Sequence, residues 1–147
     1  MTESLSTVPG VKAFVVYRNQ LLFLQRDNGR WNLPGGAIED GETPDQAILR
    51  EMEEELCIRP ASVRYLGWHD HADGARVHRH LIRLADTEAA SIRPGGEEQV
   101  FRFMSIDELP PLPTTDRLKS YLLSVLGPLR AMVEREEIVD RSALRLN

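Results

Sequence analysis

The stretch GAIEDGETPDQAILREMEEELCI, residues 36–58, decides how this chain of 147 residues is interpreted. A helix start is well marked inside it, because Thr43 precedes Pro44 and Gln46 completes a Thr-x-x-Gln capping box. At about 100° per residue, an apolar stripe forms along one side of this helix, made of Ile48, Leu49, Met52 and Leu56. The pattern predicts an amphipathic helix from Pro44 to about Leu56.

Three carboxylates gather on the helix face beside that stripe. Glu51, Glu54 and Glu55 are spaced i, i+3 and i+4, whereas Glu53 points away from them and is interpreted as a bystander. Like charges at this spacing repel by a few tenths of a kcal/mol per pair, and the helix dipole disfavours anions near the C-terminal end. Mg²⁺ prefers oxygen ligands, often a few carboxylates together with substrate phosphates. The face favours a metal site, and a solvated acidic surface is the plain alternative.

Length and composition indicate one globular domain. The chain is 41% hydrophobic and 28% charged, which is typical of a folded protein. Its net charge of −5, with no basic run, disfavours a long nucleic acid as partner. The single cysteine, Cys57, excludes an internal disulfide, and the sequence contains neither a signal peptide nor a membrane span. A cytoplasmic location with no membrane partner is therefore expected.

Strand and helix patterns follow one another along the chain. Residues 1–9 are a polar tail, and a hairpin is predicted next, with strands at 12–17 and 20–26 and its turn at Arg18-Asn19. The remaining predicted elements are strands at 63–72, 76–85 and 100–106, and helices at 113–126 and 128–139 separated by Gly127-Pro128. The order predicts one mixed α/β domain over 1–147, with 128–147 as a C-terminal helical extension.

The spacing of residues 36–58 resembles the Nudix box, Gly-x5-Glu-x7-Arg-Glu-U-x-Glu-Glu-x-Gly-U, in which U is a bulky apolar residue. Gly36, Glu42, Arg50-Glu51, Met52, Glu54-Glu55 and Ile58 occupy the fixed positions. The pattern departs at Cys57, where the family has glycine. Glycine there often forms a left-handed helix cap, which would cost a cysteine about 1–2 kcal/mol. We expect Cys57 to be a small buried residue rather than a nucleophile.

The resemblance implies an α/β/α sandwich around a mixed sheet, with the box as a loop-helix-loop. It implies a MutT-like hydrolase that uses Mg²⁺ or Mn²⁺ and a water nucleophile to cleave a nucleoside di- or triphosphate or a nucleotide-linked diphosphate. By position, Glu51, Glu54 and Glu55 match the metal ligands, with the Gly35 carbonyl as a further one. Glu42 and Arg50 match a pair that steadies the loop and the helix. The general base is left open between Glu51 and an acid in the loop 97–98, where Glu97 is preferred.

The substrate side rests on fewer residues. Arg26 is placed to meet a phosphate, and Gly35-Gly36 allow close approach of a ligand. Trp31 either stacks on a base or packs in the core, and the core is preferred. Two histidine pairs with i, i+2 spacing, His69 with His71 and His78 with His80, are interpreted as a polar sheet face rather than a metal or phosphate site. Substrate signatures of relatives that cleave ADP-ribose, diadenosine polyphosphates or NADH are missing.

Other functions are weighed on the same residues. A non-catalytic nucleotide- or metabolite-sensing domain on this fold often loses box acids, which this chain keeps. An RNA 5′-end pyrophosphohydrolase is disfavoured by the acidic charge for long RNA but not for a short 5′ end. An isopentenyl diphosphate isomerase requires a catalytic cysteine outside the box, which this chain lacks. Related proteins are often dimers, so a homodimer is compatible with the sequence.

Overall fold

A mixed sheet organises the computed structural model, which describes residues 8–71, 74–96 and 100–147. Within these residues the strand order is β3-β2-β1-β6-β5, while β4 pairs with β1 and β7 pairs with β2. β1 and β6 run parallel, and the other pairs are antiparallel. The strand bounds are β1 Gly10–Tyr17, β2 Gln20–Gln25, β3 Trp31–Asn32, β4 Gly35–Ala37, β5 Arg64–Asp70, β6 Arg76–Arg83 and β7 Val100–Met104.

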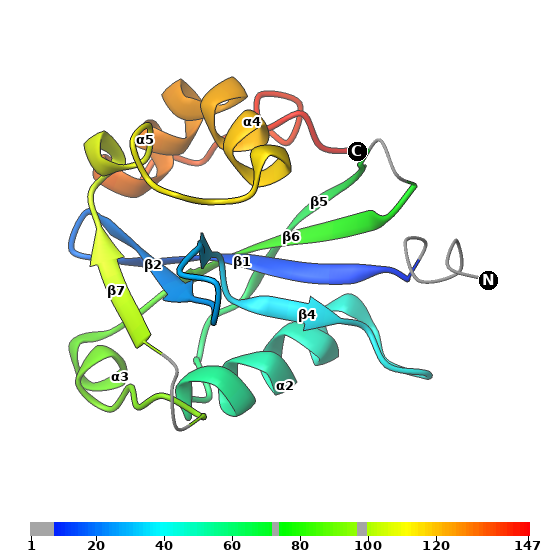
Figure 1. Ribbon diagram of the computed structural model, residues 1–147, viewed down its shortest axis with the longest axis vertical. Helices are drawn as coiled ribbons and strands as arrows, with labels where there is room; N and C mark the ends of the chain where they lie inside the picture. Colours follow the sequence, from blue (N-terminus) through cyan, green and yellow to red (C-terminus); the bar gives the residue numbers. More distant parts are fainter. Residues whose placement is uncertain (1–7, 72–73, 97–99) are drawn as a thin grey trace.

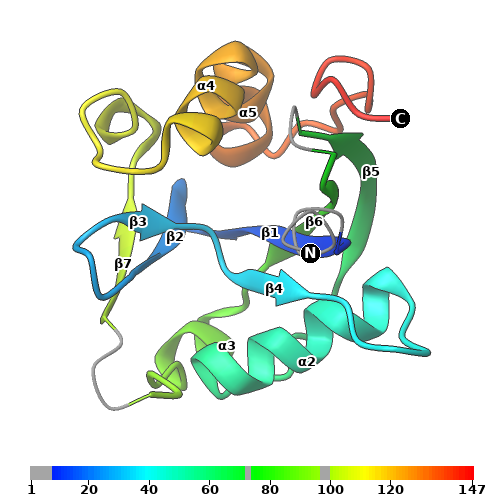
Figure 2. The same ribbon diagram turned by 45° about the vertical axis from the view of Figure 1, so that its right-hand side comes forward.

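Helices cover both faces of this sheet (Figure 1). α2 (Pro44–Leu56) and α3 (Asp86–Ala90) lie on one face, and α4 (Asp116–Ser124) and α5 (Leu126–Glu134) lie on the other. Figure 2 shows the same three layers after a turn of the molecule, with β4 between β1 and α2. A short 3₁₀ helix, η1 (Ile106–Glu108), leads from β7 toward α4. The expected α/β/α sandwich is confirmed.

Two apolar cores follow from the alternation of side chains along the strands. Phe14 and Val16 of β1 belong to the cluster under α4 and α5, whereas Val11 and Val15 belong to the cluster over α2. Because successive side chains of a strand point to opposite faces, Lys12 lies on the α4 side. A lysine is thus placed in a row of buried apolar residues, next to β4.

The predicted hairpin turn is confirmed by the backbone. Arg18 and Asn19 both have positive φ, at 47° and 65°, and Tyr17 pairs with Gln20 across the turn. This is the left-handed pair that a two-residue hairpin needs to match the twist of its strands.

Both ends of α2 are fixed by local contacts. Thr43 Oγ1 accepts a hydrogen bond from the Gln46 amide, and Gln46 Oε1 accepts one from the Thr43 amide, so the predicted capping box is confirmed. The helix ends at Cys57, which takes the left-handed conformation at φ 58° and ψ 34°. The expectation that Cys57 is buried was wrong, because this cap turns its side chain outward and leaves it exposed.

The second half of the chain departs from the predicted bounds. The break between the last two helices falls at Val125 instead of Gly127-Pro128, since Pro128 lies in the first turn of α5, where no N–H donor is needed. α5 ends at Glu134 rather than near 139, because Glu136 has a left-handed φ of 53°. Residues 135–147 are therefore not a helical extension.

The segment after α5 nevertheless packs on its own domain. Leu144 and Leu146 are buried, and the Leu144 carbonyl accepts a hydrogen bond of 2.8 Å from the Tyr121 hydroxyl. Asn147 exchanges backbone hydrogen bonds with Trp68 of β5. These contacts place the chain end against α4 and β5, while Ile138 stays exposed.

Candidate active site

Arg50 joins the loop before α2 to the acidic face of the helix. Its Nε donates to Glu42 Oε2 at 2.7 Å and its Nη2 to Glu42 Oε1 at 3.0 Å. Nη2 also donates to the Ala37 carbonyl, and Nη1 lies 3.1 Å from Glu51 Oε1 and 3.0 Å from Glu54 Oε2. The hydrogen bond from Arg50 holds the pKa of Glu42 below its usual value. The structure brings together the two residues that the sequence paired, and it leaves one oxygen each of Glu51 and Glu54 clear of Arg50.

Glu55 lies deeper than its neighbours on the helix. Only 7% of it is exposed, and its Oε1 accepts a 2.8 Å hydrogen bond from the Gly35 amide. Its other oxygen lies 3.8 Å from Nη1 of Arg26. Burial raises the pKa of Glu55 to about 7, against the opposing effects of the Gly35 amide and Lys12. A carboxylate held this way in a poorly solvated position is a group that a cation would stabilise.

The two glycines after Pro34 let the strand and the helix approach closely. A Cβ on Gly35, which has a φ of 143°, would lie 2.0 Å from the Val11 carbonyl oxygen. A Cβ on Gly36 would lie 2.5 Å from Glu51 Oε1. β4 therefore touches β1 on one side and the Glu51 carboxylate on the other, and glycine is required for this spacing.

Sequence reasoning missed two cations beside these residues, the half-buried Lys12 and the buried Arg79. Lys12 pairs in register with Gly35 on one side and with Arg79 on the other. Its Nζ donates to the Leu33 carbonyl at 3.1 Å, and burial lowers the pKa of Lys12 to about 8. Arg79 is 2% exposed, and burial lowers the pKa of its guanidinium as well, to about 10. Each cation stands at a core-facing position of its strand, and this was the signal in the sequence. Around Arg79 the flanking histidines obscured the alternation of apolar and polar residues that would have revealed it.

Other predicted site residues take different places. Glu53 pairs with Arg59 through hydrogen bonds of 2.8 and 3.0 Å, away from the acidic face, and its interpretation as a bystander stays a prediction. Trp31 is half-buried and packs against the cluster under α4 and α5, in line with the preferred core placement. Glu97 and Glu98 lie outside the described residues, so the general base from that loop stays a prediction.

The histidines divide between the two faces of the sheet. His80 is buried on the α2 side, where its Nε2 lies 3.1 Å from Asp45 Oδ1, and His78 Nδ1 lies 2.7 Å from the Tyr65 hydroxyl. His69 lies on the α4 side, with its ring stacked on Tyr121 at 4.6 Å. The described part of the chain holds no group of three or more His, Cys, Asp or Glu side chains already gathered as a metal centre. The interpretation of the histidines as polar strand positions stays a prediction.

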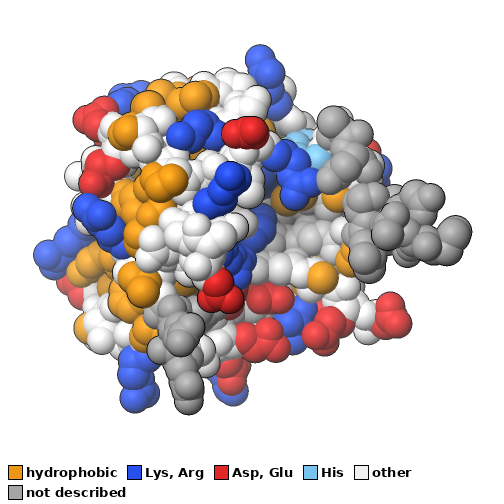
Figure 3. Space-filling view, in the orientation of Figure 1, with side chains coloured by type: hydrophobic (Ala, Val, Ile, Leu, Met, Phe, Trp, Pro, Cys, Tyr) orange, Lys and Arg blue, Asp and Glu red, His pale blue; other side chains and the backbone are white. Residues whose placement is uncertain are grey.

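Figure 3 shows how the charges are distributed around the site. Acidic side chains gather over α2 and the loop before it, and basic side chains border a hollow above them. The donors on the α2 side are carboxylate oxygens, which suit a hard divalent cation. Among the described residues, no helix is both long and apolar enough to cross a membrane.

Comparisons with known proteins agree with this geometry. The NUDIX domain family matches residues 7–124. The CMP-5′-(N-acetyl-N-hydroxy-3-aminopropyl)phosphonate hydrolase of Streptomyces rubellomurinus is 35% identical over 135 residues, covering 81% of this chain and 65% of that protein. The RNA pyrophosphohydrolase of Hydrogenovibrio crunogenus is 35% identical over 79 residues, covering 51% of this chain and 47% of that protein. The chain thus spans less than two thirds of the length of these two curated relatives.

A solved structure with related sequence supports the same fold. The crystal structure of the MutT NUDIX hydrolase from Burkholderia pseudomallei has a TM-score of 0.64 and 27% identity to this chain. The match covers 77% of this chain and 95% of that one. The superposition therefore includes nearly the whole of the Burkholderia pseudomallei protein.

Proposed function

The chain belongs to the Nudix family, and from this premise we propose that it is a metal-dependent phosphoanhydride hydrolase. Its substrate class is a nucleoside di- or triphosphate or a nucleotide-linked diphosphate. One observation carries the proposal: Arg50 and the Gly35 amide hold Glu51, Glu54 and Glu55 in place beside the Gly35-Gly36 strand. A charged face fixed this firmly suits the binding of a reactive group more than simple solvation.

The residues present suit Mg²⁺ or Mn²⁺ in their donor chemistry. Glu51, Glu54, Glu55 and the carbonyl of Gly35 would hold the metal, with Glu97 as an additional ligand from its loop. A divalent ion bound there would neutralise the diphosphate and make a water molecule more acidic. Glu55 supports this assignment, because its carboxylate is buried and lies 3.8 Å from its nearest ion-pair partner, Arg26.

The side chains have separate roles in the proposed reaction. Arg26 orients a substrate phosphate, since its guanidinium borders Glu55 and is 39% exposed. Arg50 fixes the positions of Glu51 and Glu54 and touches both catalytic carboxylates. Either Glu51 or Glu97 accepts the proton of the attacking water, and Glu51 has its Oε2 clear of Arg50 for this. Trp31, Gly35 and Gly36 are assigned to substrate contacts in this proposal.

A matched pair of variants on one helix tests the proposal. Purified protein is incubated with nucleoside triphosphates, nucleotide-linked diphosphates and Mg²⁺ at roughly millimolar concentration, and phosphate and pyrophosphate release are measured. We expect Glu54→Gln to abolish turnover without loss of fold. Glu53→Gln, which changes the same charge next to it, is expected to keep the activity because Glu53 pairs outward with Arg59. Equal activity of the two variants would reject the assignment.

A second substrate, the 5′-triphosphate end of RNA, is favoured by the similarity to the Hydrogenovibrio crunogenus RNA pyrophosphohydrolase. The similarity to the CMP-linked phosphonate hydrolase covers more of this chain and favours a nucleotide-linked substrate instead. A short triphosphorylated RNA in the same panel separates the two candidates. Binding of a nucleotide without any turnover would instead support the sensing domain.

A further inference from the structure

A small cavity on the α4 side of the sheet is lined by Lys12 of β1 and Arg79 of β6. It has a volume of about 70 Å³, and Lys12 and Arg79 lie side by side in its wall. Neighbouring strands are about 4.8 Å apart, and the charge of Arg79 is one of the effects that lower the pKa of Lys12. Both side chains come from the face of the sheet that α4 covers, and Asn32 and Thr115 complete the lining.

Arg79 is buried, and no carboxylate forms an ion pair with it among the described residues. Its Nε donates to His69 Nε2 at 3.2 Å, and its guanidinium lies 4.4 Å from the ring centre of Tyr121. His69 is a neutral acceptor here, because burial and the charge of Arg79 lower its pKa to about 4. Nη1 of Arg79 is buried and has no hydrogen-bond partner in the described part of the chain. A buried guanidinium with an orphaned N–H donor costs stability unless a ligand completes it.

Lys12 adds a second cation that is satisfied only by a carbonyl. Its hydrogen bond to Leu33 leaves its charge without an ion pair among the described residues, although Glu55 and Glu51 act on it from a distance. The half-buried Lys12 and the buried Arg79 repel each other, and Coulomb repulsion is stronger where solvent is partly excluded. A fold retains such a pair where an anion is bound between them.

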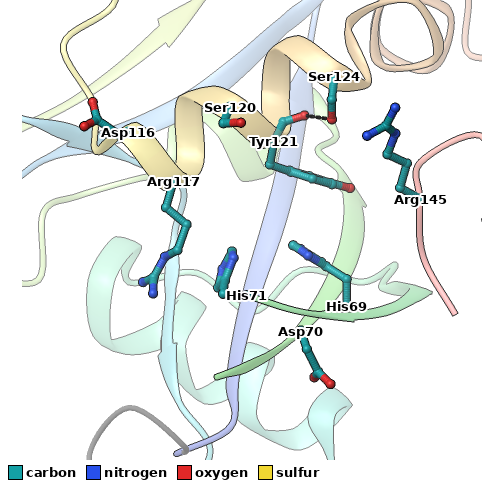
Figure 4. A pocket seen from close by; sticks show the side chains of 9 residues that line it. All are labelled: His69, Asp70, His71, Asp116, Arg117, Ser120, Tyr121, Ser124 and Arg145. Atoms are coloured by element: carbon teal, nitrogen blue, oxygen red, sulfur yellow. Dashed lines mark hydrogen bonds between the residues drawn. The ribbon is translucent and has the colours of Figure 1, made fainter. Parts of the chain in front are cut away.

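The size of the cavity selects the kind of anion. Pockets that take whole drug-sized molecules are about 300–1,000 Å³, so this one admits only a compact group. A larger hollow of about 700 Å³ adjoins it, and both are lined by His71 and Arg117. Figure 4 shows these two side chains on facing elements at one end of the hollow, with His69 and Tyr121 farther along. The hollow gives a route from solvent to the cavity.

We infer that the cavity between Lys12 and Arg79 binds a compact oxyanion of the substrate, a phosphate, phosphonate or carboxylate group. The inference rests on the proposed function, since Lys12 is the register neighbour of Gly35 and so places this group next to the reacting diphosphate. The rest of that end of the substrate extends into the hollow. The protein thereby selects substrates that carry an additional negative group over substrates with a neutral one.

Binding without turnover tests the inference separately from the proposed function. The full chain, with a chelator present, is titrated with inorganic phosphate, methylphosphonate and acetate, and the ¹⁵N resonance of Arg79 Nε is followed by NMR. We expect at least one of these probes to bind and to shift that resonance, and the one that binds identifies the chemistry. Arg79→Met is expected to weaken binding by at least about tenfold, measured by calorimetry.

Arg83→Met is the matched control. Arg83 lies on the same strand and its Nη2 donates to the Met132 carbonyl at 2.8 Å, outside the cavity. This variant is expected to bind the oxyanion like the unchanged chain. The inference is overturned if none of the three probes binds, or if Arg79→Met and Arg83→Met bind alike.

Thermal unfolding separates a binding role from a structural one. Arg79→Met is expected to unfold at the same temperature as the unchanged chain or higher, because it removes an unpaired buried charge. A large loss of stability would assign Arg79 to the core instead and overturn the inference. Lys12→Met tests the same cavity from the other strand, and it too is expected to weaken oxyanion binding.

Kinetics then connect the cavity to the reaction. Two nucleotide-linked diphosphates are compared, one ending in a phosphonate and one in an uncharged alkyl group. Arg79→Met is expected to lower the kcat/KM of the phosphonate compound relative to that of the alkyl compound by at least about tenfold. If neither compound is hydrolysed, the proposed function fails for this substrate class, while the titration still decides whether the cavity binds an oxyanion.

Discussion

The Gly35 amide donates a 2.8 Å hydrogen bond to Oε1 of Glu55, across 20 positions of sequence. This contact joins β4 to α2 and keeps the carboxylate facing the strand. It also allows a charged group to stay buried, since one of its oxygens has a backbone donor. The placement of Glu55 is thus a property of the whole loop-helix-loop, and several predictions depend on it.

The stability of the metal-free protein is expected to depend on pH through Glu55. Its pKa is about 7 in the folded chain and 4.5 in the unfolded reference. The folded state binds more protons between these values, so the contribution of Glu55 to the free energy of unfolding falls as pH rises from about 4.5 to about 7. Glu55→Gln keeps an acceptor for Gly35 but cannot ionise. As pH rises over this range, the free energy of unfolding of Glu55→Gln is expected to increase relative to that of the unchanged chain by on the order of 2–3 kcal/mol.

Urea unfolding at pH 4.5 and pH 8 with a chelator measures this difference. Subtracting the two proteins at each pH removes the effects of other groups, including His69. If the difference in unfolding free energy between the two proteins is the same at both pH values, the raised pKa of Glu55 is contradicted.

Removal of the Arg50 guanidinium is expected to destabilise the fold and to impair turnover. Arg50→Met leaves Glu42, Glu51 and Glu54 without their shared cation, and we expect a loss of about 2–4 kcal/mol. Arg59→Met is the control, because within the described residues Arg59 forms its ion pair with Glu53 alone and is largely exposed; its expected loss is below about 0.5 kcal/mol. Denaturant titration measures the free energy of unfolding of both variants. Equal losses would show that Arg50 contributes no more to stability than an exposed ion pair does.

The two glycines of β4 are expected to respond differently to alanine. At Gly36 the new Cβ meets the flexible end of Glu51, so Gly36→Ala displaces the carboxylate and lowers kcat about 100-fold with little change in stability. At Gly35 it meets the Val11 backbone, so Gly35→Ala costs about 3 kcal/mol or more. Thermal unfolding and turnover assays on both variants check the pair. A folded, fully active Gly36→Ala variant would contradict the position of Glu51.

Cys57→Gly is expected to stabilise the chain by about 1 kcal/mol. Cys57 has a left-handed backbone at the end of α2, a conformation that costs an L-residue about 1–2 kcal/mol and costs glycine little. Cys57→Ala keeps the strain and is expected to change stability by less than about 0.5 kcal/mol. Thermal unfolding under reducing conditions compares the three proteins. A gain equal in both variants would point to the thiol rather than to the backbone.

Local patterns in the sequence predicted the elements near the site well. The capping box at Thr43 and the two-residue turn at Arg18-Asn19 depend on neighbouring residues alone, and both were confirmed. The pairing of Arg50 with Glu42 was implied by the resemblance to the Nudix box, and the structure contains it. Helix ends in the second half were less predictable, because Pro128 is compatible both with a break and with a first helical turn.

The residues that the sequence did not identify lie on different strands. Lys12 and Arg79 are 67 positions apart, and only the parallel pairing of β1 with β6 brings them side by side. The histidines illustrate the reverse case, because their close spacing predicted nothing about which face each strand would present. The exposure of Cys57 likewise depended on how the chain leaves α2.

The sequence by itself determined the family, the acidic helix and its cap, because these depend on the identity and spacing of residues that are close together in the sequence. The tertiary structure alone decided that Glu55 is buried against Gly35 and that Lys12 and Arg79 line one cavity. The reason is physical: burial and the resulting loss of solvation depend on which strands pair and which helix covers them, and neither is encoded in local spacing.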